Sequence, residues 1–232
     1  MFAGRAFKAL LFDMDGTILT SIAAAEKVWG AWAERHGLDV AQFLTTIHGK
    51  RAIDTVRGEN LPGIDVEAEA AWVTEAEINE VGGIAAINGA RRFLASLDPD
   101  DWAIVTSAPL ALARRRLEAA GLTVPRHIVT AEDVTVGKPA PDGYLLAARR
   151  LGVSIGDCLV FEDAPAGITA GEASGASVLV ITATHSAPQR SPHPMIADYV
   201  GLSTKTTANG MVLRRVTQPG DGVLPLPLGS RG

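Results

Sequence analysis

Blocks of apolar residues alternate with amphipathic stretches along the chain, and this pattern predicts an α/β fold. Near-continuous apolar runs at 7–12, 102–105, 158–161 and 177–181 are typical of strands covered on both faces. A shorter strand is expected at 127–129, and helical spacing occurs at 88–97, 110–120, 143–151 and in a helix that runs through Ala173. The alternation predicts a doubly wound parallel sheet.

The segment between the first two strands breaks this alternation. It carries helical spacing at 21–36, 40–46, 51–58 and 66–81, which is too much for one crossover helix. Residues 20–85 are therefore expected to form an inserted α-helical cap, and residues 1–19 and 86–216 the core. Residues 217–232 mix Pro, Gly and Leu without periodicity, so we expect an irregular tail there.

Two carboxylates directly follow the first apolar run, where the sequence reads DMDGT and the acids are Asp13 and Asp15. Open α/β sheets place their chemistry at the carboxyl ends of strands. Buried acids need a cation or hydrogen-bond donors to stay ionised, so this pair indicates a metal site. The alternative is a turn in which both acids only accept hydrogen bonds from backbone amides.

Polar residues also end two later strands. Thr106 and Ser107 follow the second apolar run, and their hydroxyls and amides could hold a phosphoryl oxygen, although Ser and Thr end many strands for turn reasons. Glu162 and Asp163 follow a third run, in FEDAPAG. Lys138 lies between them in GKPAPD, where the prolines predict a rigid loop rather than a solvated helix face.

The motifs DMDGT, GKPAPD and FEDAPAG resemble those of the haloacid dehalogenase superfamily of phosphohydrolases. The resemblance implies a Rossmann-like core in which Asp13 attacks phosphorus and becomes a phosphoaspartate. It implies that Asp15 protonates the leaving group and then activates water. It also implies phosphate contacts from Thr106, Lys138 and, as a second hydroxyl, Ser107. The implied cofactor is Mg²⁺, held by Asp13, the Asp15 main-chain carbonyl and Asp163, with Glu162 as a ligand or as a nearby acceptor.

The segment HGKRAIDT at 48–55, together with VTSA, FEDAPAG and Thr184-His185, resembles the sugar phosphatases related to glycerol-phosphate and 2-deoxyglucose-6-phosphate phosphatases. The resemblance implies a small sugar or polyol phosphate as substrate, bound between core and cap. His48, Lys50 and Arg51 are expected to contact its organic part, because they follow a predicted helix end. The alternative is that each is an ordinary exposed polar residue.

Other functions share parts of this pattern. A phosphotransferase resembling β-phosphoglucomutase would keep the motifs and the cap, but such mutases commonly carry a cap-hinge His where Ala25 stands here. Because a methyl group donates no hydrogen bond, Asp15 is expected to be free to activate water. A binding module without turnover would not be expected to keep Asp13, Asp15 and Lys138 together. A haloacid dehalogenase would lack Asp15, and a phosphonatase would carry a Schiff-base lysine in its cap.

Composition and charge limit the kinds of partner that the protein is expected to bind. The chain has 232 residues, 47% of them hydrophobic, and a formal net charge of −5, so it offers no basic footprint for nucleic acid. Cys158 is its single cysteine and cannot form an intrachain disulfide. No leader and no apolar run of about 20 residues is evident, so no membrane partner and a cytoplasmic location are expected. The expected partner is a small phosphorylated metabolite; oligomeric state stays open, and a monomer is compatible.

Overall fold

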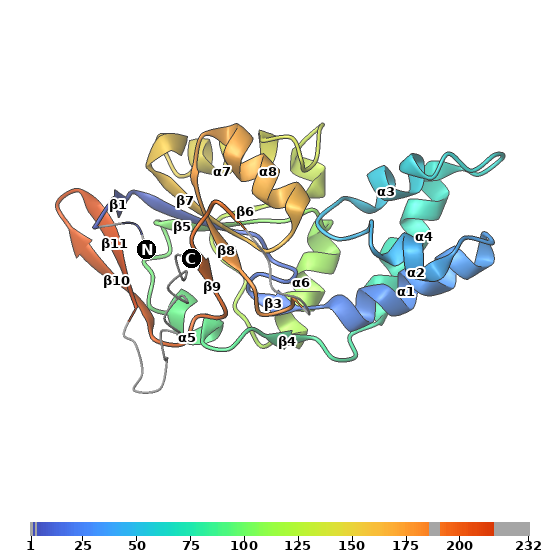
Figure 1. Cartoon of the computed structure of the whole chain (residues 1–232), viewed down its shortest axis with the longest axis horizontal. Coiled ribbons are helices and arrows are strands. Elements are labelled where there is room, and N and C mark those ends of the chain that lie inside the picture. Colours follow the sequence, from blue (N-terminus) through green and yellow to red (C-terminus); the bar gives the residue numbers. More distant parts are fainter. Residues whose placement is uncertain (1, 3, 186–190, 216–232) are drawn as a thin grey trace, which may run out of the picture.

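The computed structural model describes residues 2, 4–185 and 191–215, so the tail expected at 217–232 lies outside the described residues. Its centre is a six-stranded parallel sheet of order β6-β5-β2-β7-β8-β9 (Figure 1). The strands are β2 (Ala9–Phe12), β5 (Trp102–Val105), β6 (Ile128–Val129), β7 (Cys158–Glu162), β8 (Ser177–Ile181) and β9 (Met195–Ile196). The predicted doubly wound parallel sheet is therefore confirmed.

Helices cover both faces of this sheet (Figure 1). Successive side chains of a strand point to opposite faces, so Leu10 and Phe12 pack in one apolar cluster while Ala9 and Leu11 pack in another. The first cluster includes side chains of α5 (Ala90–Leu94) and α6 (Leu110–Ala119), and the second includes those of α7 (Asp142–Arg150) and α8 (Pro165–Ser174). This explains the unbroken apolar runs: every position of the central strands is buried.

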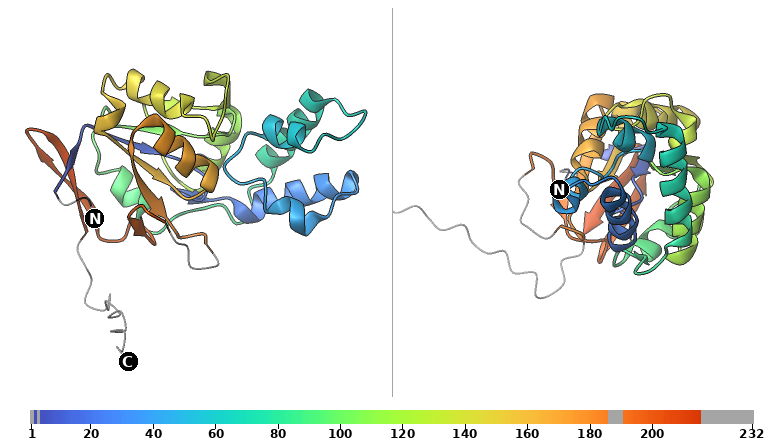
Figure 2. Two further views of the ribbon diagram at one scale, coloured as in Figure 1. Left: turned by 45° about the horizontal axis from the view of Figure 1, so that its top comes forward. Right: turned by 90° about the vertical axis from the view of Figure 1, so that its right-hand side faces the viewer.

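Four helices form a separate group at one end of the molecule, which we call the cap (Figures 1 and 2). They are α1 (Ile22–Arg35), α2 (Val40–Leu44), α3 (Ala52–Gly58) and α4 (Val66–Asn79). The cap has its own apolar cluster around Trp32, Phe43 and Val73. The chain leaves and re-enters the core through β3 (Leu19–Thr20) and β4 (Ala85–Ala86), which pair antiparallel. The exact division at residues 20 and 85 stays a prediction.

A second, three-stranded sheet lies at the end of the core away from the cap (Figure 2). It pairs β1 (Ala6–Phe7) with β11 (Gly210–Arg215), which also pairs with β10 (Leu202–Thr207). The single strand expected at 7–12 is thus split at Lys8, and the prediction of one strand was wrong there. Both halves are apolar, so the hydrophobic pattern could not reveal that they join different sheets. None of the described helices is long and apolar enough to cross a membrane.

Candidate active site

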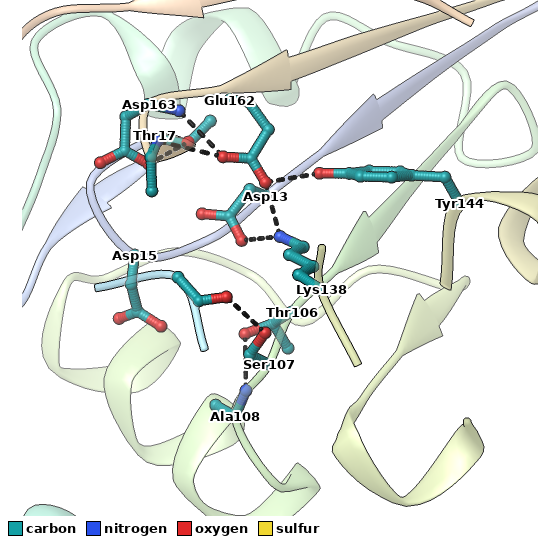
Figure 3. Close-up of polar contacts among 12 residues, drawn as sticks. Asp13, Asp15, Thr17, Thr106, Ser107, Ala108, Lys138, Tyr144, Glu162 and Asp163 are labelled. Carbon is teal, nitrogen blue, oxygen red and sulfur yellow. Dashed lines mark hydrogen bonds and ion pairs between the residues drawn. The ribbon is translucent and has the colours of Figure 1, made fainter. Parts of the chain in front are cut away.

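The order of the strands brings the predicted site residues together. Strand β2 lies between β5 and β7, so Asp13, Thr106 and Glu162 meet at the carboxyl edge of the sheet (Figure 3). All three side chains are buried. Between this edge and the cap lies a cavity of about 480 Å³, whose lining includes Asp13, Asp15 and Thr106. The geometry is therefore that of a site on the core that is covered by the cap.

At the floor of the site, Lys138 lies between two carboxylates (Figure 3). Its Nζ donates to Asp13 Oδ1 at 2.5 Å and to Glu162 Oε1 at 2.6 Å. Burial alone favours the neutral amine, but the two carboxylates outweigh it and raise the pKa of Lys138 above its ordinary value. Burial also raises the pKa of Asp13 to about 7, with Lys138 opposing this shift and the other acids adding to it. The site therefore needs further positive charge to keep its acids ionised.

Glu162 is held by donors on both of its oxygens. Oε1 accepts from Lys138 and from the Tyr144 hydroxyl at 2.7 Å, and Oε2 accepts from the backbone amides of Asp163 and Ala164 at 3.0 and 3.3 Å. Gly167 makes room for this carboxylate, because a Cβ there would lie 1.7 Å from Oε1. Of the two roles expected for Glu162, these contacts support the acceptor that holds Lys138.

The site fits a divalent cation. Carboxylate oxygens of Asp13, Glu162 and Asp163 all lie within 4.8 Å of one another, and oxygen donors of this kind suit Mg²⁺. Burial raises the pKa of Asp163, and the neighbouring acids add to the shift. Three buried carboxylates face one lysine, so a bound cation would complete the charge balance. Asp13 and Asp163 are the better candidate ligands, because the oxygens of Glu162 already have donors.

The side chain of Asp15 points away from that of Asp13 (Figure 3). Its Oδ1 accepts from Ser21 Oγ at 2.6 Å, and its Oδ2 lies 3.0 Å from Nη1 of Arg116. The expectation that Asp15 is free to activate water stays a prediction: Ala25 offers no donor, but Ser21 and Arg116 contact the two carboxylate oxygens. The sequence did carry a signal, because Arg116 occupies the apolar face of α6 beside Leu117.

The two hydroxyls that end β5 differ in their surroundings. Thr106 Oγ1 accepts from the amide of Ala108 at 3.1 Å, and both Thr106 and Ser107 line the cavity. Ser107 Oγ, however, donates to the carbonyl of Gly49 at 2.9 Å, so it joins the core to the cap. A phosphate contact by either hydroxyl stays a prediction.

The cap residues expected to contact substrate are only partly brought together. His48 and Lys50 line the cavity, and burial lowers the pKa of His48, with Glu26 opposing. Arg51 is not in that lining. Its guanidinium pairs with Asp54 at 2.6 Å and donates to two carbonyls of the core, at Val134 and Thr135. It starts α3 and turns toward the loop before Lys138, where the absence of a side chain on Gly137 leaves it room.

His185 is the second of the pair Thr184-His185, and both residues line the cavity. Its ring Nε2 lies 2.9 Å from the main-chain oxygen of Asp163. This contact holds His185 beside Asp163, a candidate metal ligand. The sequence pattern alone could not predict the contact.

Comparison with known proteins gives consistent matches. Residues 7–175 match the model of the haloacid dehalogenase-like hydrolase family. Hexitol phosphatase A of Escherichia coli (strain K12) is 43% identical over 186 residues, which cover 78% of this chain and 86% of that protein. 2-Deoxyglucose-6-phosphate phosphatase 2 of Saccharomyces cerevisiae is 34% identical over 196 residues, or 75% and 80% of the two chains. A solved hydrolase from Pseudomonas syringae superposes with a TM-score of 0.70 at 26% identity, covering 78% of this chain and 87% of that one.

Proposed function

Because this chain belongs to the haloacid dehalogenase-like hydrolases, we propose that it is a magnesium-dependent phosphatase of small sugar or polyol phosphate monoesters. One observation carries the proposal: Asp13, which lines the cap-covered cavity, binds Lys138 at 2.5 Å beside the acids at the end of β7. An anionic nucleophile can approach a phosphate dianion only where cations neutralise both. Lys138 and a divalent ion at Asp13 and Asp163 would provide that balance.

In this mechanism a carboxylate oxygen of Asp13 attacks phosphorus, and the bond from phosphorus to the ester oxygen breaks. Asp15 gives its proton to the departing alkoxide, so the leaving group departs as an alcohol. Water then attacks the phosphoaspartate, Asp15 takes up the proton, and the bond between Asp13 and phosphorus breaks to release inorganic phosphate. Mg²⁺, held by Asp13 and Asp163, would stabilise the charge that spreads over the phosphoryl oxygens.

The cavity supports a small organic group on the substrate. Its volume of about 480 Å³ lies in the range of small-molecule sites. The cap contributes polar groups to its lining at Glu26, His48 and Lys50, which suit hydroxyl groups of a sugar or polyol. The named relatives act on hexitol phosphates and on 2-deoxyglucose 6-phosphate, and we propose the same substrate class here. The cytoplasmic location expected from the sequence stays a prediction.

The alternative is a phosphotransferase resembling β-phosphoglucomutase, in which Asp15 is kept from water until a sugar arrives. The contacts of Asp15 with Ser21 and Arg116 hold its carboxylate away from Asp13, as a mutase would require. The experiment below therefore includes the mutase reaction. The absence of a donor at Ala25 favours hydrolysis, because the hinge contact typical of the mutases is missing.

Phosphorus NMR separates the two functions. The enzyme with Mg²⁺ is incubated with a hexitol phosphate, glycerol 1-phosphate and 2-deoxyglucose 6-phosphate, and separately with β-glucose 1-phosphate plus a trace of the 1,6-bisphosphate. We expect inorganic phosphate as the product, with no requirement for the bisphosphate. If glucose 6-phosphate accumulates faster than free phosphate, the protein is a mutase and the phosphatase assignment is wrong. No conversion of any ester would reject both.

A further inference from the structure

The buried Arg116 connects the carboxylate of Asp15 to the cap. Arg116 projects from α6, and its side chain is 7% exposed. Its Nη1 lies 3.0 Å from Asp15 Oδ2, and its Nη2 donates to Glu77 Oε1 at 2.8 Å. Glu77 belongs to α4 in the cap and is buried as well. One planar guanidinium thus joins an acid of the core to an acid of the cap.

The charges of this group support a fixed geometry. Burial lowers the pKa of Arg116, but Asp15 and Glu77 outweigh it and raise that pKa, so the guanidinium stays charged. Burial raises the pKa of Glu77, and Arg116 opposes this. A charged arginine that is taken out of water needs both partners, because an unpaired buried charge is strongly destabilising. Ser21 holds the other oxygen of Asp15, so both oxygens of that carboxylate are fixed.

We propose that Arg116 is a positioning residue for Asp15, and that Glu77 makes this positioning depend on the cap. The proposal rests on the proposed function, in which Asp15 is the acid and the base. Asp15 must meet the ester oxygen within hydrogen-bond reach to protonate it. Arg116 sets the direction of that carboxylate, and Glu77 sets the direction of Arg116 when α4 lies against α6. The cap thereby contributes to proton transfer as well as to substrate contact.

Two other roles for Arg116 predict different behaviour. If Arg116 only stabilises the fold, its removal should affect all substrates alike through the amount of folded enzyme. Arg116 Nε has no hydrogen-bond partner among the described residues, so a second possibility is that it binds the sugar directly. In that case the loss of activity should depend on which sugar the substrate carries, and not on whether the leaving group needs a proton. A positioning role predicts a loss that follows the need of the leaving group for a proton.

Arg116→Gln is therefore assayed on a series of small phosphate monoesters without sugar groups, from methyl phosphate to p-nitrophenyl phosphate. The value of kcat/KM reports the transfer to Asp13, and p-nitrophenolate leaves without a proton. We expect kcat/KM to fall about 30- to 100-fold for methyl phosphate and by no more than about threefold for p-nitrophenyl phosphate, since positioned acids contribute roughly 10²–10⁴-fold. Arg115→Gln is the matched control, because Arg115 is the neighbour on the same helix and its side chain is 42% exposed. Equal losses across the series would overturn the proposal.

A double-mutant cycle tests whether Arg116 acts through Asp15. Arg116→Gln added to Asp15→Asn should cost nothing further with methyl phosphate, because the proton-transfer group is already lost. Additive losses would overturn the proposal, because Arg116 would then act independently of Asp15. If Asp15→Asn itself leaves methyl phosphate turnover unchanged, the proposed function fails at Asp15. If Asp15→Asn is impaired and Arg116→Gln is not, only the role of Arg116 fails.

A second pair of variants addresses folding and the cap. If Arg116→Gln does not fold, the apolar double substitution Arg116→Met with Glu77→Met removes both buried charges and is expected to fold. It should show the same selective loss with methyl phosphate. Glu77→Gln keeps the contact between Arg116 and Asp15, so we expect a smaller selective loss, of about three- to tenfold. Full activity of folded Glu77→Gln across the series would overturn the part of the proposal that concerns the cap.

Discussion

At the scale of single residues, the main feature of the site is the excess of buried negative over buried positive charge. Asp13, Glu162 and Asp163 are buried together, and Lys138 is the one cation that contacts the first two directly among the described residues. Tyr144 adds a neutral donor. The sequence pattern predicted which acids and which lysine meet, because strand ends and a proline-rich loop are local features. It could not predict the contacts of Glu162, which depend on the packing of α7 and α8 against β7.

Tyr144→Phe tests one of these contacts. The substitution removes the hydroxyl that donates to Glu162 at 2.7 Å, and a hydrogen bond to a charged group is worth about 1.5–3 kcal/mol. We expect the free energy of unfolding to fall by that amount in denaturant titrations. Tyr199→Phe is the matched control, because the buried Tyr199 hydroxyl has no hydrogen-bond partner among the described residues. Equal destabilisation by both substitutions would contradict the account.

At the scale of elements, the first turn of α8 is shaped around Glu162. Gly167→Ala would place a Cβ 1.7 Å from Glu162 Oε1, so the carboxylate would have to leave Lys138. We expect kcat to fall at least tenfold while circular dichroism stays unchanged, since misplaced catalytic groups lose about 10²-fold for a shift of about 1 Å. Gly58→Ala in α3 is the control: a Cβ there meets nothing within 4 Å. Retained activity in Gly167→Ala would show that Glu162 is not needed in this place.

The elements also show how far sequence patterns reach. The helices of the cap and the central strands follow the hydrophobic spacing within a few residues, because each buries one face or both. The strands β1, β3 and β4 were missed, since two-residue strands have no period to detect. Arg51 was assigned to the substrate, but the start of α3 directs it to the carbonyls of Val134 and Thr135. The local pattern HGKR does not encode that direction.

The cap residues just before α3 are expected to have two different roles, substrate preference and attachment of the cap to the core. His48→Ala or Lys50→Ala should change the preference order among sugar and polyol phosphates, because both residues line the cavity. Arg51→Ala should leave that order unchanged and reduce kcat/KM for all substrates alike, since its guanidinium joins the cap to the core. Steady-state kinetics on a panel of esters, with p-nitrophenyl phosphate as reference, measures both effects. A changed preference order in Arg51→Ala would contradict this assignment.

At the scale of the whole molecule, polar contacts join core and cap around the site. Ser107 reaches Gly49, Arg51 reaches the loop before Lys138, and Arg116 reaches Glu77. Each contact connects the cap to a segment that carries a predicted catalytic or phosphate-binding residue. The position of the cap and the arrangement of the site are therefore coupled through these contacts.

The buried acids predict that metal binding depends on pH. Burial raises the pKa of Asp13 to about 7, so below pH 7 a proton competes with Mg²⁺ for this carboxylate. We expect the Kd of Mg²⁺ to rise by at least about tenfold per pH unit below pH 7, because protons on Asp13 and on Asp163 compete with the ion. Isothermal titration calorimetry from pH 5.5 to 8.5 measures this, with Asp13→Asn as the control. A Kd that does not change with pH would contradict the picture of Asp13 as a ligand.

The most direct test of the central claim is the release of inorganic phosphate from a hexitol phosphate in the presence of Mg²⁺, by the natural protein and by Asp13→Asn. We predict turnover by the natural protein, loss of that turnover on addition of EDTA and its return with excess Mg²⁺. Asp13→Asn, shown to be folded by circular dichroism, should release no phosphate, because an amide cannot attack phosphorus. Undiminished phosphate release by folded Asp13→Asn, or by the metal-free natural protein, would contradict the account.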